Sequence, residues 1–185
     1  MWPILELYAR LTEYPNELIV PEIHSLARKL RDCGNAESAL NQLAKFGDGV
    51  EHASVAELQE LFTRTFDLLP VCSPHLGFQL FGESYKRGSL MAMLREEYRR
   101  VGLSEGAEIP DHLSCVLKLC ALLSKREQER EVYAELLTLI VLPGVDKMVA
   151  AFAAAPNPYK HLLQSLASWL SAHSDFSQAG KIKMG

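Results

Sequence analysis

Apolar residues recur at helical spacing along almost the whole chain, and this pattern limits the fold more than any other feature of the sequence. Ile23, Leu26, Ala27 and Leu30 follow the i, i+3, i+4, i+7 pattern of one helix face. Apolar and polar residues nowhere alternate for long enough to predict a strand. The sequence therefore predicts an all-α protein, a compact helical bundle in which short helices share one core.

The same spacing predicts further buried stripes, which end at a last helix before residue 171. These stripes are Ala36, Ala39, Leu40, Leu43 and Ala44; Val55, Leu58, Leu61, Phe62, Thr65 and Phe66; Leu90, Leu94, Tyr98 and Val101; Leu113, Val116, Leu117 and Cys120; and Tyr159, Leu162, Leu163, Leu166 and Leu170. A long helical pattern also covers residues 126–155, and we expect Pro143-Gly144 to break or kink it.

Helix ends are predicted from the residues that cap them. We expect Asn35, Ser54, Ser89 and Asp111 to begin helices and Gly102 to end one. Ser54 is followed by Glu57 at the spacing of a capping box, in which each side chain accepts a hydrogen bond from the other residue's backbone N–H.

The length of 185 residues suits one domain, which we place at residues 1–170. Periodicity is lost from residue 171 to residue 185, where we expect a frayed tail. Hydrophobic residues make up 48% of the chain, enough for a core that needs no disulfide or structural metal.

Charge and hydropathy argue against two classes of partner. The formal net charge is −4 and no basic run is interleaved with aromatic residues, which argues against binding nucleic acid. The longest apolar stretch, residues 136–142, is far shorter than the roughly 20 residues that a membrane span needs. The N-terminus lacks the pattern of a secretory signal, so we expect a cytoplasmic protein with reduced cysteines.

The stretch from Asp67 to Gly88 does not fit the helical pattern. It contains two prolines and three glycines, yet it is rich in apolar and aromatic residues, whereas a solvated loop is polar. Phe78, Phe81 and Tyr85 therefore need either a core to enter or a ligand to meet. We interpret the region as the lining of a binding surface, with core packing of individual rings as the alternative.

A second irregular patch, residues 102–113, places Glu105, Glu108 and Asp111 around a histidine at a helix start. Capping is the simplest role for Asp111, and a structural hydrogen bond is the simplest role for His112. A helix N-terminus disfavours added positive charge, so we expect His112 to be neutral.

Motifs of catalysis and cofactor binding are missing from the sequence. Gly77 and Gly82 have the spacing of two phosphate-loop glycines, but Glu83 follows where that loop has lysine. Cys72 and His75 form a single C-x-x-H pair without a second pair to complete a zinc site. We therefore expect no enzyme activity, no metal and no cofactor.

Several short motifs of the sequence resemble those of one known protein family. Phe66-Asp67, Leu80-Phe81-Gly82-Glu83-Ser84 and Arg87-Gly88, with Met91 and Leu94, resemble the central motif of the NarJ branch of the NarJ/TorD/DmsD family. Residues 108–113 resemble that family's E-x-P-D-H-L signature, and Leu11-Thr-Glu-Tyr-Pro15 resembles its L-x-x-Y-P opening.

The resemblance implies a cytoplasmic, all-helical chaperone of the TorD-like type. Its partner would be the apo catalytic subunit of a molybdenum oxidoreductase. The chaperone would bind the N-terminal leader, or leader remnant, of that subunit until the molybdopterin cofactor is inserted.

Such a segment is basic and partly apolar, so it needs an apolar groove with an acidic rim. We assign the groove to Phe62, Phe66, Leu76, Phe78 and Phe81, and the rim to Asp67, Glu83, Glu108 and Asp111. Gly77 and Gly88 would allow close backbone approach, and Arg87 is expected to pair with one of the acids. Pro110 and His112 complete the candidate site as part of the E-x-P-D-H-L signature.

Two other functions remain open at this stage. One is a structural subunit that stays permanently in a helical redox complex. The other is a nucleotide-dependent factor, with Asp111 and His112 as an acid–base pair. The sequence does not distinguish a monomer from a dimer, and it does not name the client enzyme.

Overall fold

The computed structural model describes residues 2–68, 70–104, 108–152 and 156–173, and the regular structure of these residues is helical. The helices are α1 (Trp2–Leu11), α2 (Ile19–Cys33), α3 (Glu37–Val50), α4 (Val55–Phe66), α5 (Leu76–Phe81), α6 (Tyr85–Val101), α7 (Leu113–Leu123), η1 (Glu127–Glu129), α8 (Arg130–Glu135), η2 (Leu136–Val141), α9 (Leu142–Ala151) and α10 (Pro158–His173). The part of the chain that is described contains one isolated β-bridge and no strand, which confirms the all-α prediction.

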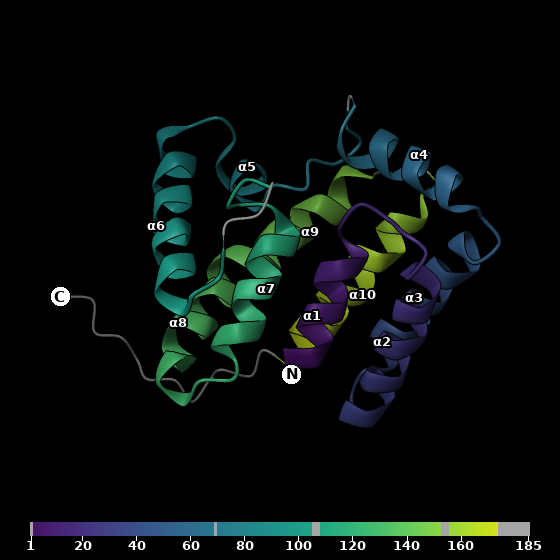
Figure 1. Cartoon of the computed structure of the whole chain (residues 1–185), viewed down its shortest axis with the longest axis horizontal. Coiled ribbons are helices and arrows are strands. Elements are labelled where there is room, and N and C mark those ends of the chain that lie inside the picture. Colours follow the sequence, from purple (N-terminus) through teal and green to yellow (C-terminus); the bar gives the residue numbers. More distant parts are fainter. Residues whose placement is uncertain (1, 69, 105–107, 153–155, 174–185) are drawn as a thin grey trace.

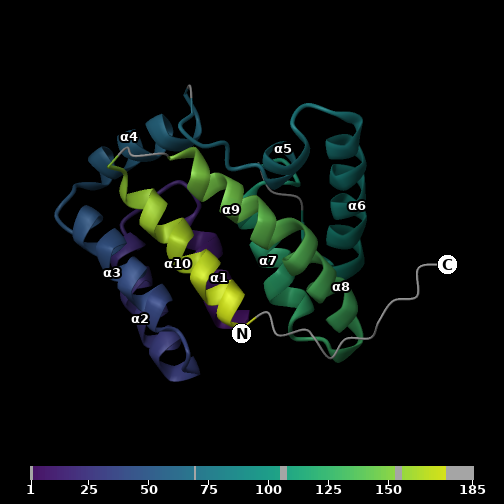
Figure 2. The ribbon, with the colours of Figure 1, turned by 180° about the vertical axis from the view of Figure 1, so that it is seen from behind.

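Helices α1 and α10 lie in the middle of the molecule, with α2, α3 and α4 to one side and α5 to α8 to the other (Figures 1 and 2). Helix α10 packs against α3 and α9, and α1 packs against α2 and α7. The hydroxyl groups of Tyr8 and Ser165 are 2.7 Å apart and join the two central helices within the core. A single cluster of buried apolar residues extends from Ile4 to Leu170.

Local sequence signals account for several element boundaries. Ile23, Leu26 and Leu30 of α2 are buried, as their spacing predicted. The capping box is confirmed, because Ser54 Oγ accepts from the Glu57 N–H and Glu57 Oε2 accepts from the Ser54 N–H. Gly102 ends α6 with φ +77°, a left-handed conformation in which glycine carries no steric penalty.

Two predicted helix starts are wrong. Asn35 does not cap α3: it has φ +47°, and Ala36 precedes the helix without a capping side chain. Ser89 lies within α6, which begins at Tyr85. The first turn of α6 contains no buried apolar residue, so the buried stripe begins only at Leu90.

At Pro143-Gly144, where a break or a kink was predicted, the chain is not interrupted: the helical path continues from α8 through the π-helical turn η2 into α9. The Leu142 N–H donates to the carbonyl of Leu137, five residues earlier. This wider turn precedes the proline, which has no N–H to donate. Gly144 serves packing, because a Cβ there would lie 2.6 Å from Leu76 Cδ2 on α5.

The predicted end of this helical region at Ala155 lies outside the described residues, as does the tail beyond His173. Helix α10 runs to His173, two residues past the predicted start of that tail. None of the helices in the described ranges is long and apolar enough to cross a membrane.

Candidate functional site

The two irregular stretches of the sequence meet in space. Residues 76–81 form the short helix α5, and its first residue is held by the loop that precedes α7. The Leu76 N–H donates to the Asp111 carbonyl at 2.8 Å, and the Leu113 N–H donates to the Pro74 carbonyl at 2.9 Å. This antiparallel bridge between His75 and His112 fixes α5 against the E-x-P-D-H-L signature.

Asp111 does not cap α7, so that prediction is wrong. His112 precedes the first helical residue in an extended conformation, and its Nδ1 accepts a hydrogen bond from the Ser114 N–H at 3.2 Å. The Asp111 side chain is instead completely buried, and its Oδ2 accepts from Arg87 Nε at 2.8 Å. Its other oxygen, Oδ1, has no hydrogen-bond partner among the residues that the structure describes.

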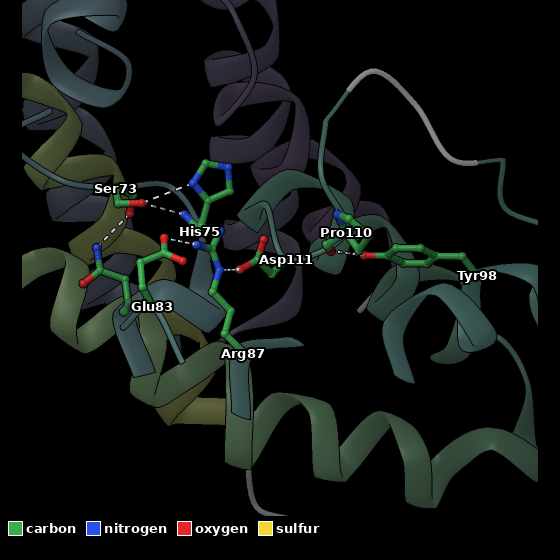
Figure 3. A network of polar contacts seen from close by, with 8 residues as sticks. Ser73, His75, Glu83, Arg87, Tyr98, Pro110 and Asp111 are labelled. Atoms are coloured by element: carbon green, nitrogen blue, oxygen red, sulfur yellow. Dashed lines mark hydrogen bonds and ion pairs between the residues drawn. The ribbon is translucent and has the colours of Figure 1, made fainter. Parts of the chain in front are cut away.

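Arg87 joins the buried acid to the surface (Figure 3). Its Nη1 donates to Glu83 Oε1 at 2.5 Å. Its guanidinium also lies 5.7 Å from the centre of the Phe78 ring. The hydrogen bond to Asp111 raises the pKa of Arg87, which stays protonated. The expected role of Arg87 as a partner of these acids is confirmed, and the side chain links α6 to α5 and to the loop before α7.

Gly77 is required by the close approach of α5 to this ion pair. A Cβ at position 77 would lie 2.7 Å from Asp111 Oδ2 and 3.1 Å from Arg87 Cγ. Gly88 differs, because a Cβ there would meet no described atom within 4 Å. Packing within the described chain therefore explains Gly77 and leaves Gly88 without a structural requirement.

The two histidines of the bridge are neutral at pH 7. Burial is the main cause that lowers the pKa of His112 to about 4, and the neighbouring His75 lowers it further. Burial also lowers the pKa of His75, although the charge of Asp111 acts in the opposite direction. Their rings pack edge to face with centroids 5.6 Å apart. Because both imidazoles are neutral, neither offers a positive charge to a ligand at pH 7. The expected neutrality of His112 has burial as its main cause.

The exposed part of the site lies on α5 and just after it. Phe78 and Phe81 are 39% and 37% exposed, and the Glu83 side chain is 77% exposed. Tyr85, at the start of α6, is almost fully exposed. The sequence marked Tyr85 as an aromatic residue that needs either a core or a ligand, and the structure leaves it exposed.

A pocket of about 210 Å³ opens on the other side of the signature, between the end of α6 and α7. It is lined by Tyr98, Leu103, Ser104, Glu108, Pro110, Cys115 and Lys118. The Tyr98 hydroxyl donates to the Pro110 carbonyl at 2.6 Å and fixes this wall. Lys118 pairs with Glu13. Only Glu108 and Pro110 of this lining were predicted, because its other residues carry no motif.

Three residues of the predicted groove are core residues. Phe62 and Phe66 are buried on α4, with ring centroids 5.7 and 5.0 Å from that of Tyr159. Leu76 is fully buried and meets α9 at Gly144. Asp67 is exposed at the end of α4. Of the apolar residues predicted for the groove, Phe78 and Phe81 on α5 are therefore the exposed ones, and Glu83 follows them in the chain.

The family comparison covers most of the chain. The model of the family described as nitrate reductase delta subunit matches residues 31–173. The chain belongs to this family. Both the central motif and the E-x-P-D-H-L signature lie inside the matched range, whereas the L-x-x-Y-P opening at residues 11–15 precedes it. The family resemblance drawn from the sequence is thus confirmed.

A solved structure supports the fold of this delta-subunit family member. The crystal structure of a protein from Archaeoglobus fulgidus, described as a redox enzyme maturation protein, aligns with a TM-score of 0.60 and 17% sequence identity. The alignment covers 92% of this chain and 94% of the other. No curated protein matches the chain.

Proposed function

We propose that this delta-family chain is an assembly chaperone that binds the N-terminal segment of the apo catalytic subunit of a molybdenum oxidoreductase. It holds that segment, a leader or a leader remnant, until the molybdopterin cofactor is inserted. Family membership supports a part in the maturation of a redox enzyme. We infer that the chain catalyses no reaction of its own. The similarity of fold to a protein described as a redox enzyme maturation protein supports the same role.

The observation that carries the proposal is the exposed pair Phe78 and Phe81 beside Glu83. Two aromatic rings more than one third exposed on a six-residue helix offer an apolar contact, and a carboxylate that is 77% exposed offers a charge for a basic residue. The Arg87–Asp111 ion pair contacts this helix at Gly77 and Phe78 and supports its position. A partly apolar, basic peptide matches such a surface in both respects.

The pocket beside the signature extends the site. Glu108 is exposed and Ser104 supplies a hydroxyl, so the pocket offers two acceptors for a cationic side chain. The ammonium group of Lys118 is paired with Glu13, which offsets its repulsion of such a ligand. Asp111 is fully buried, so it acts by positioning Arg87 and not by touching the peptide.

The test is to co-express the full chain with the apo-subunits of its host's molybdoenzymes and to identify the subunit that co-purifies. Calorimetry then measures binding of that subunit's N-terminal peptide at low and raised salt. We expect binding that weakens with salt, because exposed charge pairs are screened. Phe78→Ala with Phe81→Ala should weaken binding by about 10-fold or more, the usual cost of losing central aromatic contacts.

The matched control is Leu18→Ala, which removes an exposed apolar side chain just before α2, a helix that packs against α1 and α3. Glu83→Gln should mainly reduce the salt dependence, because it removes one charge at the rim. Equal binding by the parent and the double phenylalanine variant, with both folded, would place the peptide elsewhere. The absence of any co-purifying subunit would reject the chaperone role.

A further inference from the structure

Cys33 and His173 form a thiol–imidazole pair at the C-terminal ends of two helices. Cys33 is the last residue of α2, His173 is the last residue of α10, and Cys33 Sγ lies 3.8 Å from His173 Nε2. Cys33 is exposed. These ends of α2 and α10 lie at the bottom of the molecule in both ribbon views, whereas α5 lies towards the top (Figures 1 and 2).

The hydrogen bond at Nδ1 of the imidazole determines which ring nitrogen carries the hydrogen. His173 Nδ1 is 2.9 Å from the Trp169 carbonyl oxygen, which can only accept, so Nδ1 carries the hydrogen. In the neutral ring, Nε2 then holds a free lone pair that faces the thiol. The Trp169 indole stacks on the imidazole with centroids 5.2 Å apart and planes 25° apart, which holds the ring in this orientation.

Among the described groups that contact the Cys33 thiol, the imidazole is the one that can take up its proton. The carbonyl oxygens of Leu30 and Gly34 lie 3.3 Å and 3.5 Å from Cys33 Sγ. A carbonyl oxygen accepts a hydrogen bond from the thiol but does not take up its proton at neutral pH. His173 can take up that proton at Nε2, which faces the thiol. The arrangement is that of a nucleophile, a base and a group that orients the base.

The other cysteines lack these features. Cys72 and Cys120 are buried, and burial raises the pKa of each thiol to about 12. Burial also raises the pKa of Cys115, which is half-buried. A thiolate forms least readily in such surroundings, so these three thiols are poor nucleophiles.

We propose that Cys33 is a site of thiol–disulfide exchange with small disulfides, and that His173 is its general base. His173 Nε2 takes the thiol proton while Cys33 Sγ attacks one sulfur of the disulfide. The disulfide bond breaks, a mixed disulfide forms at Cys33, and the departing thiolate receives the proton from His173. The site is independent of peptide binding, because it lies on other helices than the apolar surface of α5.

The experiment incubates the full-length chain with glutathione disulfide at neutral pH and follows the adduct by intact mass and peptide mapping. We expect the first adduct at Cys33 and none at that peptide in Cys33→Ser. His173→Gln should slow adduct formation by about 10-fold or more, because general bases contribute at least this much to proton transfer. His24→Gln, which changes an exposed histidine of α2, is the matched control and should react like the parent.

The pH profile separates a base from a merely structural histidine. The parent should react faster than His173→Gln near neutral pH, and the two rates should converge at high pH, where hydroxide removes the thiol proton without a base. Tyr8 of α1 also couples electrostatically to Cys33, but burial raises its pKa and it stays neutral over this range. Equal rates and profiles for the parent and a folded His173→Gln variant, or faster reaction at Cys115, would overturn the proposal.

Discussion

Replacing Arg87 by methionine tests the ion pair that holds α5 and α6 together. Methionine keeps an apolar stem of similar length but removes the guanidinium that bonds to Asp111 and Glu83. The Asp111 carboxylate is completely buried, and Arg87 is only 11% exposed, so water replaces little of what is lost. The exposed bond to Glu83 contributes little by comparison.

The expected loss is worked from the environment of Asp111. Its Oδ1 has no partner, so among the described residues the bond from Arg87 Nε is what satisfies this carboxylate. Removing one member of a buried ion pair leaves an uncompensated charge and costs about 3–5 kcal/mol. We expect Arg87→Met to lower the free energy of unfolding by this amount. Arg99→Met, at an exposed arginine of the same helix, should change it by less than about 0.5 kcal/mol.

The assay is urea unfolding followed by circular dichroism, with the slope of the transition compared between variants. Asp111→Asn and the double variant Arg87→Met/Asp111→Asn complete a double-mutant cycle. The double variant should be clearly more stable than the sum of the two single losses predicts, because it removes the stranded charge. We expect a coupling energy of at least about 1.5 kcal/mol, the range of a hydrogen bond to a charged group.

A loss below about 1 kcal/mol for Arg87→Met would refute this reasoning, as would additive effects in the cycle. Either result would mean that Asp111 gains another proton donor or water when Arg87 is absent. The buried pair would then not be what holds α5 in place.

Three further predictions concern stability. Gly77→Ala should destabilise the chain by about 1–3 kcal/mol, because the new Cβ would lie 2.7 Å from Asp111 Oδ2. Gly88→Ala should be neutral or stabilise the chain by up to about 1 kcal/mol, because Gly88 lies inside a helix and a Cβ there meets open space; thermal unfolding of the two variants tests the difference. His112 binds its proton less readily when folded, with a pKa of about 4, than when unfolded, with a pKa of 6.5. The unfolded state therefore takes up more protons between these values, so stability should fall by up to about 3 kcal/mol as the pH drops from 6.5 towards 4, and His112→Asn should flatten that decline in urea unfolding series. Ser54→Ala should cost about 1 kcal/mol through the lost capping box, and a change under 0.3 kcal/mol in denaturant unfolding would contradict that role.

Much of the helical framework follows from local sequence. The spacing of Leu26 and Leu30 predicts a buried helix face, because helical periodicity is a property of the residues themselves. The predicted helix start at Ser54 and helix end at Gly102 are confirmed. Both signals depend only on residues within one helical turn, so the sequence contains them. Asn35 failed as a cap because a good capping residue still needs an extended backbone, and Asn35 has a positive φ.

The candidate site was predicted in part. The central motif includes Phe81 and Glu83, and the aromatic residues of the irregular stretch include Phe78; the structure leaves all three exposed. The sequence analysis placed Phe62 and Phe66 both in a buried helix stripe and in the groove, and the structure buries them. The pocket residues Ser104, Cys115 and Lys118 were not predicted, because none of them belongs to a motif and only folding brings them together.

The sequence by itself determined that this chain is helical and which family it belongs to, because both depend on local pattern and short motifs. Tertiary structure decided the role of individual residues. Asp111 looks like a helix cap in the sequence, but the bridge between His75 and His112 turns it inward to Arg87. Gly144 looks like a helix breaker, but it allows Leu76 to approach α9. Burial and close approach arise from segments far apart in the chain, so no local pattern contains them.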